Sequence, residues 1–248
     1  MNGLHFTKMQ GLGNDFVVIE GPIELGPDEV AALCDRRFGV GADGVLVATN
    51  DDEIRMDYRN ADGSAAEMCG NGLRCVARYA YDRGWTPGRT FTVTTPDGER
   101  GVIVKDDSVD AELGRPRIGE EVHLDGHAYR LVDMGNPHAV RMVEDPSSID
   151  VDLVGSSLQS HFPQGANIEF VSVSDHGISL RVWERGVGET MACGTGMAAA
   201  AAVAGEGGDG ARVRVSVPGG VGSVEIRDGV AWLEGPAEVS FSGTFGGR

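Results

Sequence analysis

The chain contains the same short cysteine loop twice. Cys69-Gly70-Asn71-Gly72 and Cys193-Gly194-Thr195-Gly196 share the order Cys-Gly-x-Gly, and their cysteines lie 124 positions apart in a chain of 248 residues. The match extends beyond the loops without a gap, since residues 41–47 fall on residues 165–171. Repetition at half the chain length predicts two halves of similar fold, each long enough to bury a core of its own.

Each half shows the same series of strand and helix signals. In the first half, a helix is expected from Gly72 to Arg83, with Gly84 as its stop. In the second half, an alanine-dense helix is expected from residue 194 to residue 204, closed by the glycine-rich residues 205–208. Small side chains suit a helix that strands wrap closely. Strands are expected at residues 16–19, 45–48, 54–58, 91–94 and 102–104, then again at 168–171, 178–182, 213–217 and 224–226, with one more helix at 27–35.

These signals predict an α+β fold. It consists of two pseudo-symmetric domains, each a set of mostly antiparallel strands wrapped around a central helix, with the boundary near residues 114–119. The early loops also correspond, because Asn14 and Asn136 follow glycine at an offset of 122.

Composition limits the partners of the chain. The net charge is −17 at pH 7, and Lys8 and Lys105 are the only lysines. Such charge mainly keeps a protein soluble, although a cationic partner would also fit, and lysine loss with excess acid fits work in concentrated salt. No basic stripe could neutralise nucleic-acid phosphates, no apolar run approaches the ~20 residues of a membrane span, and no export signal is visible. We expect a cytoplasmic protein without nucleic-acid or membrane partners.

Two of the four cysteines are expected to be core residues. Cys34 lies in an apolar helical segment, and Cys75 lies close to Leu73 and Val76. A reducing compartment disfavours structural disulfides, and no Cys-x-x-Cys pair suggests a zinc site. The glycine pattern of residues 39–44 matches a dinucleotide loop, but an apolar strand follows it where a helix is required. We therefore expect no metal and no cofactor.

The repeated loops carry the chemistry. Each one begins a predicted helix, where backbone N–H groups and the helix dipole favour an anion such as a carboxylate or a thiolate. The same field lowers the pKa of a cysteine there. Two opposed thiols suit a reaction in which a proton leaves one face of a carbon and arrives on the other. The alternative is that the glycines merely shape two turns and the cysteines pack; each loop also follows an acid-bearing turn, at Glu67 and Glu189.

Polar loop residues could form a cradle for an amino-acid zwitterion. Short neutral side chains that both donate and accept hydrogen bonds recur in the loops, although each one alone is explained by turn geometry. His138 and Glu184 come from corresponding segments and could assist proton transfer to each thiol. The loop asparagines are Asn14, Asn60, Asn71, Asn136 and Asn167.

Five longer motifs run in order from the first strand to the last hairpin. They are Lys8-Met9-Gln10-Gly11-Leu12-Gly13-Asn14-Asp15-Phe16, Asn60-Ala61-Asp62-Gly63-Ser64, Cys69-Gly70-Asn71-Gly72-Leu73-Arg74, Gly135-Asn136-Pro137-His138 and Glu184-Arg185-Gly186-Val187-Gly188-Glu189-Thr190-Met191-Ala192-Cys193-Gly194-Thr195-Gly196. In these motifs the chain resembles the diaminopimelate epimerase family. Related proline racemases typically have His at the place of Asn71 and proline at the place of Ala192.

The resemblance implies a cofactor-independent epimerase that interconverts LL- and meso-diaminopimelate, in lysine biosynthesis. It makes Cys69 and Cys193 the two bases, with His138 and Glu184 tuning the thiols. The residues that would hold the substrate are Asn14, Asn60, Asn136, Asn167, Glu184 and Arg185, and those that would present donors to its carboxylate are Gly70, Asn71, Gly194 and Thr195.

The resemblance also implies a homodimer of two-domain chains. The domains are expected at residues 1–115, completed by residues 240–248, and at residues 116–239. One departure is visible, because the family commonly has glutamine where this chain has Gly44. This departure bears on fine specificity and leaves the chemistry unchanged.

Other functions remain open from the residues alone. A racemase of another amino acid could use the same two cysteines. A thiol redox or sensor protein could join Cys69 to Cys193 reversibly, although the absence of Cys-x-x-Cys counts against it. An amino-acid binder without catalysis would need neither thiol.

Overall fold

The computed structural model describes residues 3–65, 68–205 and 210–246. Two expectations, the acid-bearing turn at Glu67 and the glycine-rich segment beyond Gly205, lie outside the described residues. The chain forms two compact units. Unit 1 comprises the residues up to Ala111 together with Gly235 onward, and unit 2 comprises Glu112–Glu234.

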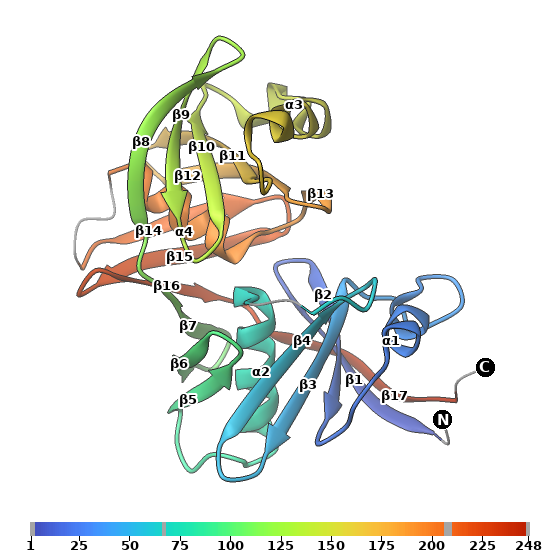
Figure 1. Cartoon of the computed structure of the whole chain (residues 1–248). Helices are drawn as coiled ribbons and strands as arrows, with labels where there is room; N and C mark the ends of the chain where they lie inside the picture. The colour runs from blue at the N-terminus through green and yellow to red at the C-terminus, as the bar shows by residue number, and fades with distance from the viewer. Residues whose placement is uncertain (1–2, 66–67, 206–209, 247–248) are drawn as a thin grey trace. The chain divides into compact units, whose positions relative to one another are not determined.

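Unit 1 is built around one helix, α2 (Gly70–Asp82), with strands on its sides (Figure 1). The buried face of α2 includes Leu73, Val76 and Ala80, which pack in one apolar cluster with residues of the surrounding strands such as Phe16. A smaller cluster lies under α1 (Pro27–Cys34). The strands are β1 (Leu4–Gly11), β2 (Asn14–Glu20), β3 (Gly44–Asn50), β4 (Ile54–Asn60), β5 (Thr90–Thr95), β6 (Gly98–Val104), β7 (Val109–Gly114) and β17 (Glu238–Phe245).

The sheet of unit 1 brings the two ends of the chain together. Strand β1 pairs antiparallel with β2 on one side and with β17 on the other. Strand β2 runs parallel to β3, and β3 forms an antiparallel hairpin with β4. The last strand thus completes the first unit.

Unit 2 repeats this plan around α4 (Gly194–Val203). The first eight residues of α4 are all buried, from Gly194 to Ala201, which agrees with an alanine-rich helix that strands can approach closely. The other elements are β8 (Arg117–Leu124), β9 (His127–Asp133), β10 (Pro137–Met142), η1 (Pro146–Ser148), α3 (Val151–Leu158), η2 (Gln159–His161), β11 (Asn167–Ser174), β12 (Gly177–Glu184), β13 (Gly188–Thr190), β14 (Arg212–Val217), β15 (Gly220–Arg227) and β16 (Val230–Gly235).

The predicted α+β fold is confirmed, and the sequence signals missed several of its elements. Strands β1, β7, β8, β9, β10, β13, β16 and β17 and helix α3 were not expected. Strand β8 is mostly exposed. Its residues therefore show neither the alternating burial of a half-buried strand nor the buried face of a helix. Among the described residues, no helix is long and apolar enough to cross a membrane.

Pairing registers show that the ungapped match of residues 41–47 with residues 165–171 is wrong by one residue. In unit 1, Val45 pairs with Arg59. In unit 2, Ile168 pairs with Trp183, which stands 124 positions after Arg59. Val45 therefore corresponds to Ile168, at an offset of 123. The reason is that the β11–β12 hairpin (residues 167–184) is one residue longer than the β3–β4 hairpin (residues 44–60). Each of its strands is one residue longer, while its turn is one residue shorter (175–176 against 51–53).

A cluster of charges fixes the start of β2. Asp15 accepts hydrogen bonds from Lys8 Nζ at 2.6 Å and from both terminal nitrogens of Arg36 at 2.7 and 3.0 Å. Burial alone would raise the pKa of Asp15, but the hydrogen bonds from Arg36 and Lys8 outweigh it and bring the pKa to about 2. The ionised form of Asp15 is therefore a part of the folded state.

We predict that Asp15→Asn lowers the free energy of unfolding by about 2 kcal/mol at neutral pH. Because the pKa of Asp15 is lower in the folded protein than in the unfolded chain, this stabilisation is present above about pH 4 and is lost as the pH falls towards 2. Urea unfolding of both proteins from pH 7 down to pH 2 measures it. Asp106→Asn is the control, since Asp106 is 83% exposed in its pair with Arg89 and should change stability little. A loss from Asp15→Asn that does not depend on pH would contradict the argument.

Candidate active site

Cys69 is the N-cap residue of α2. Its backbone is extended, and its Sγ accepts a hydrogen bond from Gly72 N at 3.4 Å, which confirms that the first cysteine loop begins a helix. The helix begins two residues earlier than expected, at Gly70. The Cβ that a larger residue would place at position 72 comes within 3.0 Å of the Leu46 side chain. Glycine thus lets the loop approach β3.

Two asparagines of unit 1 meet beside this thiol. Asn14 Oδ1 lies 3.7 Å from Cys69 Sγ and accepts a hydrogen bond from Asn71 Nδ2 at 3.1 Å. Asn14 Nδ2 donates to Asp43 Oδ2 at 2.7 Å, so Asp43 sets which way the amide faces. Asn60, at the end of β4, donates to Ser64 Oγ at 3.0 Å.

Arg74 is a fully buried cation behind the first loop. Its Nη2 donates to Asn71 Oδ1 at 2.8 Å, its Nε to Pro236 O at 3.3 Å and its Nη1 to Gly70 O at 3.5 Å. Burial lowers the pKa of Arg74, but a guanidinium stays protonated in proteins. Within the described residues no carboxylate pairs with it. From the sequence, Arg74 was named only as part of a motif. The signal that could have indicated its burial is a charged residue on the apolar face of a helix.

Cys193 is the N-cap residue of α4 and is buried. Its Sγ accepts from Gly196 N at 3.4 Å and lies 3.5 Å from Thr195 Oγ1. Thr195 Oγ1 in turn accepts from Asn136 Nδ2 at 3.4 Å. The second loop therefore has the same capping geometry as the first.

A buried histidine–glutamate pair lies beside this second loop. His138 Nδ1 donates to Glu169 Oε1 at 2.6 Å, and Nε2 lies 2.9 Å from Asn136 Oδ1. Both side chains have no exposed surface. A Cβ at position 196 would lie 2.8 Å from Glu169 Oε1, so only glycine fits there. Sequence reasoning missed Glu169, because an acid inside an apolar strand reads as exposed when pairing is unknown.

Glu184 and Asn167 complete the polar groups of unit 2. Thr190 Oγ1 donates to Glu184 Oε1. Burial raises the pKa of Glu184. Asn167 Oδ1 accepts from Arg185 N at 2.9 Å, and Arg185 Nη1 donates to Gln164 O at 3.2 Å.

The surroundings of Cys193 oppose its ionisation. Burial raises the pKa of the Cys193 thiol well above its usual range, and the carboxyl groups of Glu184 and Glu169 raise it further, while the hydrogen bonds from Thr195 and Gly196 lower it. Cys34 and Cys75 are buried too, with pKa values raised to about 11 and about 12 by burial. Both of these fit the expected packing role.

The structure thus gathers the predicted residues into one group in each unit. His138 and Glu184 both belong to unit 2, in strands β10 and β12, as does Cys193. The expectation that they come from corresponding segments is wrong, because β10 matches β2 and β12 matches β4. The group of unit 1 is Asn14, Asn60, Cys69, Gly70 and Asn71, and that of unit 2 is Asn136, His138, Asn167, Glu184, Arg185, Cys193, Gly194 and Thr195.

The glycine at position 44 is explained by the atoms next to it. A Cβ at this position would lie 2.5 Å from the Arg59 carbonyl oxygen and 2.5 Å from the Tyr58 ring. The space that a glutamine would need is therefore filled by β4. By the pairing registers, Gly44 corresponds to Asn167 of unit 2, so only one unit has an asparagine at this place.

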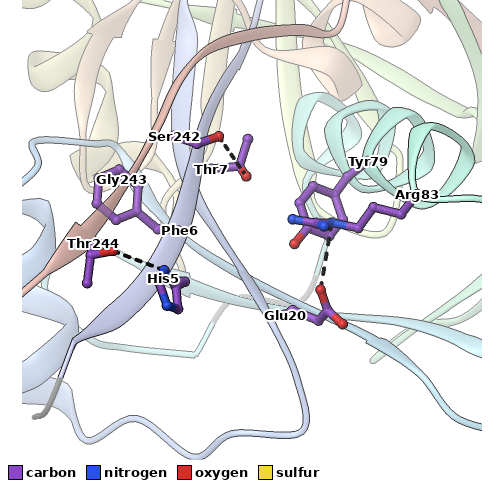
Figure 2. Close-up of a pocket in the computed structure, with 9 residues that line it drawn as sticks. All are labelled: His5, Phe6, Thr7, Glu20, Tyr79, Arg83, Ser242, Gly243 and Thr244. Atoms are coloured by element: carbon purple, nitrogen blue, oxygen red, sulfur yellow. Dashed lines mark hydrogen bonds and ion pairs between the residues drawn. The ribbon is translucent and has the colours of Figure 1, made fainter.

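Neither a metal-binding cluster nor a hollow found in unit 1 coincides with these residues. Within the described parts of the chain, no group of three His, Cys, Asp or Glu side chains could hold a metal ion. A His-x-x-x-His spacing that sequence reasoning overlooked, His123 and His127, lies across the exposed β8–β9 turn. A hollow of about 520 Å³ in unit 1 is lined by His5, Glu20, Arg83 and their neighbours and by none of the predicted site residues (Figure 2).

Comparison with known proteins identifies the family. The model of the diaminopimelate epimerase family matches residues 6–119 and 130–239. The chain belongs to the diaminopimelate epimerase family. It is 39% identical to the diaminopimelate epimerase of Leptospira biflexa over 97% of this chain and 98% of that one. It is 43% identical to that of Alkalilimnicola ehrlichii and 42% identical to that of Thermobifida fusca, over 97% of this chain and 98% and 97% of theirs.

Solved structures of related fold are more distant in sequence. A Bacillus anthracis protein of the PhzF family matches with a TM-score of 0.76 at 15% identity, over 98% of this chain and 99% of that one. A hydroxyproline epimerase from Agrobacterium vitis matches with a TM-score of 0.74 at 14% identity, over 98% and 92%. These likenesses show a diaminopimelate epimerase-like fold.

We predict that Thr195→Val slows carbamidomethylation of Cys193 by iodoacetamide about tenfold near pH 8. The hydroxyl lies 3.5 Å from Cys193 Sγ, and a hydrogen bond to a charged group stabilises it by about 1.5–3 kcal/mol. Peptide mass spectrometry after timed labelling measures the rate. Thr195→Ser keeps the hydroxyl and should label as the wild type does. Equal rates in Thr195→Val and the wild type would show that the hydroxyl does not stabilise the thiolate.

Proposed function

We propose that the protein is a diaminopimelate epimerase, an isomerase that interconverts LL- and meso-2,6-diaminopimelate. Membership of the family, with full-length relatives of that name, supports the reaction. The observation that carries it in this chain is the repeated thiol cap: Cys69 and Cys193 each receive a hydrogen bond from the backbone N–H three residues later. A binding protein would need neither thiol.

The reaction needs two proton transfers at one carbon. A thiolate removes the proton from the α carbon, and the electron pair left on that carbon delocalises into the carboxylate. The second thiol then donates its proton to the opposite face of the carbon and becomes the thiolate. The same steps run backwards from the other isomer, with the two sulfurs exchanging roles. Atoms and charge balance without a cofactor.

The protein must stabilise the extra negative charge of the intermediate. In the absence of a cofactor as electron sink, hydrogen-bond donors and helix dipoles aimed at the carboxylate supply most of this stabilisation. The N-termini of α2 and α4 offer such donors, at Gly70 and Asn71 and at Gly194 and Thr195. The aligned dipoles favour the anion more as its charge grows, which is the condition for catalysis.

The substrate also carries two ammonium groups and a distal carboxylate. We assign its binding to amides and charges of both units: Asn14, Asn60, Asn136, Asn167, Glu184 and Arg185. Asn60 of unit 1 corresponds to Glu184 of unit 2. An amide and a carboxyl group at matched places suit a substrate whose two faces must be told apart.

The test measures deuterium uptake and formation of the second isomer in the same reaction. We predict that LL-diaminopimelate incubated in D₂O with the reduced protein gains deuterium at the α carbon and yields the meso isomer. Cys69→Ala and Cys193→Ala should each slow epimerisation at least about 100-fold, since a positioned proton-transfer group contributes about 10²–10⁴ in rate. Chiral chromatography and mass spectrometry measure both readouts.

Cys75→Ala is the matched control. Cys75 is a buried thiol on the same helix as Cys69, with its pKa raised to about 12 by burial, and it should be dispensable for catalysis. No exchange with LL-diaminopimelate but exchange with proline or another amino acid would assign a racemase of a different substrate. Binding that survives both alanine variants, without exchange in the wild type, would assign a binding protein.

We also propose a homodimer. Two large apolar side chains, Val239 and Phe241, are 52% and 50% exposed on the edge strand β17, and exposed apolar patches mark interaction sites. We predict sedimentation at twice the chain mass of 26.1 kDa, and a shift to the monomer in Val239→Asp/Phe241→Asp. Val173→Asp, at a position 45% exposed in unit 2, should stay dimeric. A monomeric wild type would overturn the assignment.

The cellular setting follows from the reaction and the composition. We place the product in lysine biosynthesis, in the cytoplasm. The net charge of −17 and the use of only two lysines support adaptation to concentrated salt, where screening of the repulsion between surface acids stabilises the compact state.

A further inference from the structure

The two cysteine loops have the same capping geometry, but the buried charged side chains next to them have opposite signs. Arg74, five residues after Cys69, is a fully buried cation. At the offset of 124 that relates the two loops, the second helix has Ala198 at this place. Helix α4 therefore has no counterpart of the guanidinium. The repeat itself provides the comparison between a loop with this cation and a loop without it.

The buried pair behind the second loop is likewise absent from the first. By the pairing registers, His138 corresponds to Phe16 and Glu169 corresponds to Leu46. The contacts agree, because the glycine three residues after each cysteine approaches Leu46 in unit 1 and Glu169 Oε1 in unit 2. An apolar pair in one unit is thus a titratable pair in the other.

Arg74 acts on the residues that follow Cys69 directly. Its guanidinium donates to the Gly70 carbonyl and to the Asn71 side chain. A cation removed from water interacts strongly with nearby charge, because little solvent screens it. Asn14 Oδ1 already accepts a hydrogen bond from Asn71 Nδ2, so it does not depend on the Cys69 thiol as a donor. The ionised form of Cys69 keeps the Gly72 N–H and gains the field of Arg74.

The charged groups next to Cys193 are carboxyl groups, which oppose a thiolate there. The groups that face Cys193 are Glu169 on β11, Glu184 on β12, and the Thr195 hydroxyl and Gly196 N–H on α4, and His138 on β10 pairs with Glu169. Two carboxyl groups thus face one imidazole. Glu169 Oε2 is buried without a hydrogen-bond partner among the described residues, so part of its charge is not neutralised locally. A second negative charge on Cys193 is disfavoured there.

We propose that Arg74 and Glu169 are positioning residues that make the two thiols unequal, so that the free enzyme rests with a thiolate at Cys69 and a protonated thiol at Cys193. This inference rests on the proposed function only where it gives each thiol a part in proton transfer. In each turnover from the resting form, Cys69 then removes the α proton and Cys193 donates. After that turnover Cys193 is the thiolate and holds the less favourable charge, and the opposite turnover returns the thiolate to Cys69.

The test measures ionisation of each thiol without substrate. Timed iodoacetamide labelling of the reduced full-length protein from pH 5 to pH 11, read by peptide mass spectrometry, gives a midpoint for Cys69 and one for Cys193. The shape of each pH profile separates ionisation from accessibility. We expect the midpoint of Cys69 to be the lower. Arg74→Met and Glu169→Gln should each narrow the gap, and the Cys69-to-Cys193 ratio of rates at pH 7.5 should fall about tenfold for each pH unit of narrowing.

Two variants separate charge from structure. Arg74→Lys keeps the cation but loses the planar fork, and should retain the wild-type gap. Arg78→Met is the matched control, because Arg78 lies one turn further along α2 and also donates to backbone carbonyls, those of Lys105, Asp106 and Ser108. It should leave the gap unchanged. Circular dichroism confirms that each variant is folded before its profile is interpreted.

The labelling results test this proposal independently of the proposed epimerisation reaction. Equal midpoints in the wild type, a lower midpoint at Cys193, or an unchanged gap in both Arg74→Met and Glu169→Gln would overturn it. An Arg74→Met variant that does not fold leaves Glu169→Gln as a complete test, since glutamine keeps the acceptor for His138 and removes only the charge. Failure of the enzyme to act on diaminopimelate would not change the labelling profiles, so the two failures are distinguishable.

Discussion

The hydrogen bond from a backbone N–H to a cysteine sulfur at the start of a helix is the interaction on which the site depends. It occurs twice, from Gly72 to Cys69 and from Gly196 to Cys193, both at 3.4 Å. A side chain at the N-cap satisfies a donor that the helix leaves open. When that side chain is a thiol, the same donor and the helix dipole stabilise its ionised form. One local structure therefore begins the central helix and stabilises the thiolate form of its cap residue.

The sequence was sufficient where the signal is local. Cysteine between glycine-rich turns and helix formers predicted both caps, and the repeat predicted the α+β architecture around two central helices. It was insufficient where the signal is tertiary. Arg74 and Glu169 are charged residues inside otherwise apolar elements, and only strand pairing and helix packing show that both are fully buried. The ungapped repeat also failed by one residue in β3, because the β11–β12 hairpin is one residue longer than the β3–β4 hairpin, which shifts the register without disturbing the hydrophobic pattern around it.

That one-residue shift changes which residues correspond, and with it the chemistry. The ungapped match sets Val45 against Glu169, whereas the pairing registers set Leu46 against it. Leu46 and Phe16 face α2 as part of an apolar cluster. Glu169 and His138 replace this pair in unit 2 and introduce a short buried hydrogen bond. A duplicated fold has thus kept its backbone while one copy exchanged core packing for a polar pair.

Burial of these charges is unfavourable for folding on its own. Removing an ion from water has a large desolvation free energy that neutral partners repay only in part. Arg74 has carbonyl and amide oxygens as its described partners, and Glu169 leaves one oxygen without any. Ala198 and Leu46 show that the same fold accepts apolar residues at the corresponding places. The charged residues are therefore not required by the architecture, and their positions directly behind the two thiols give them a role in deciding which sulfur holds the proton.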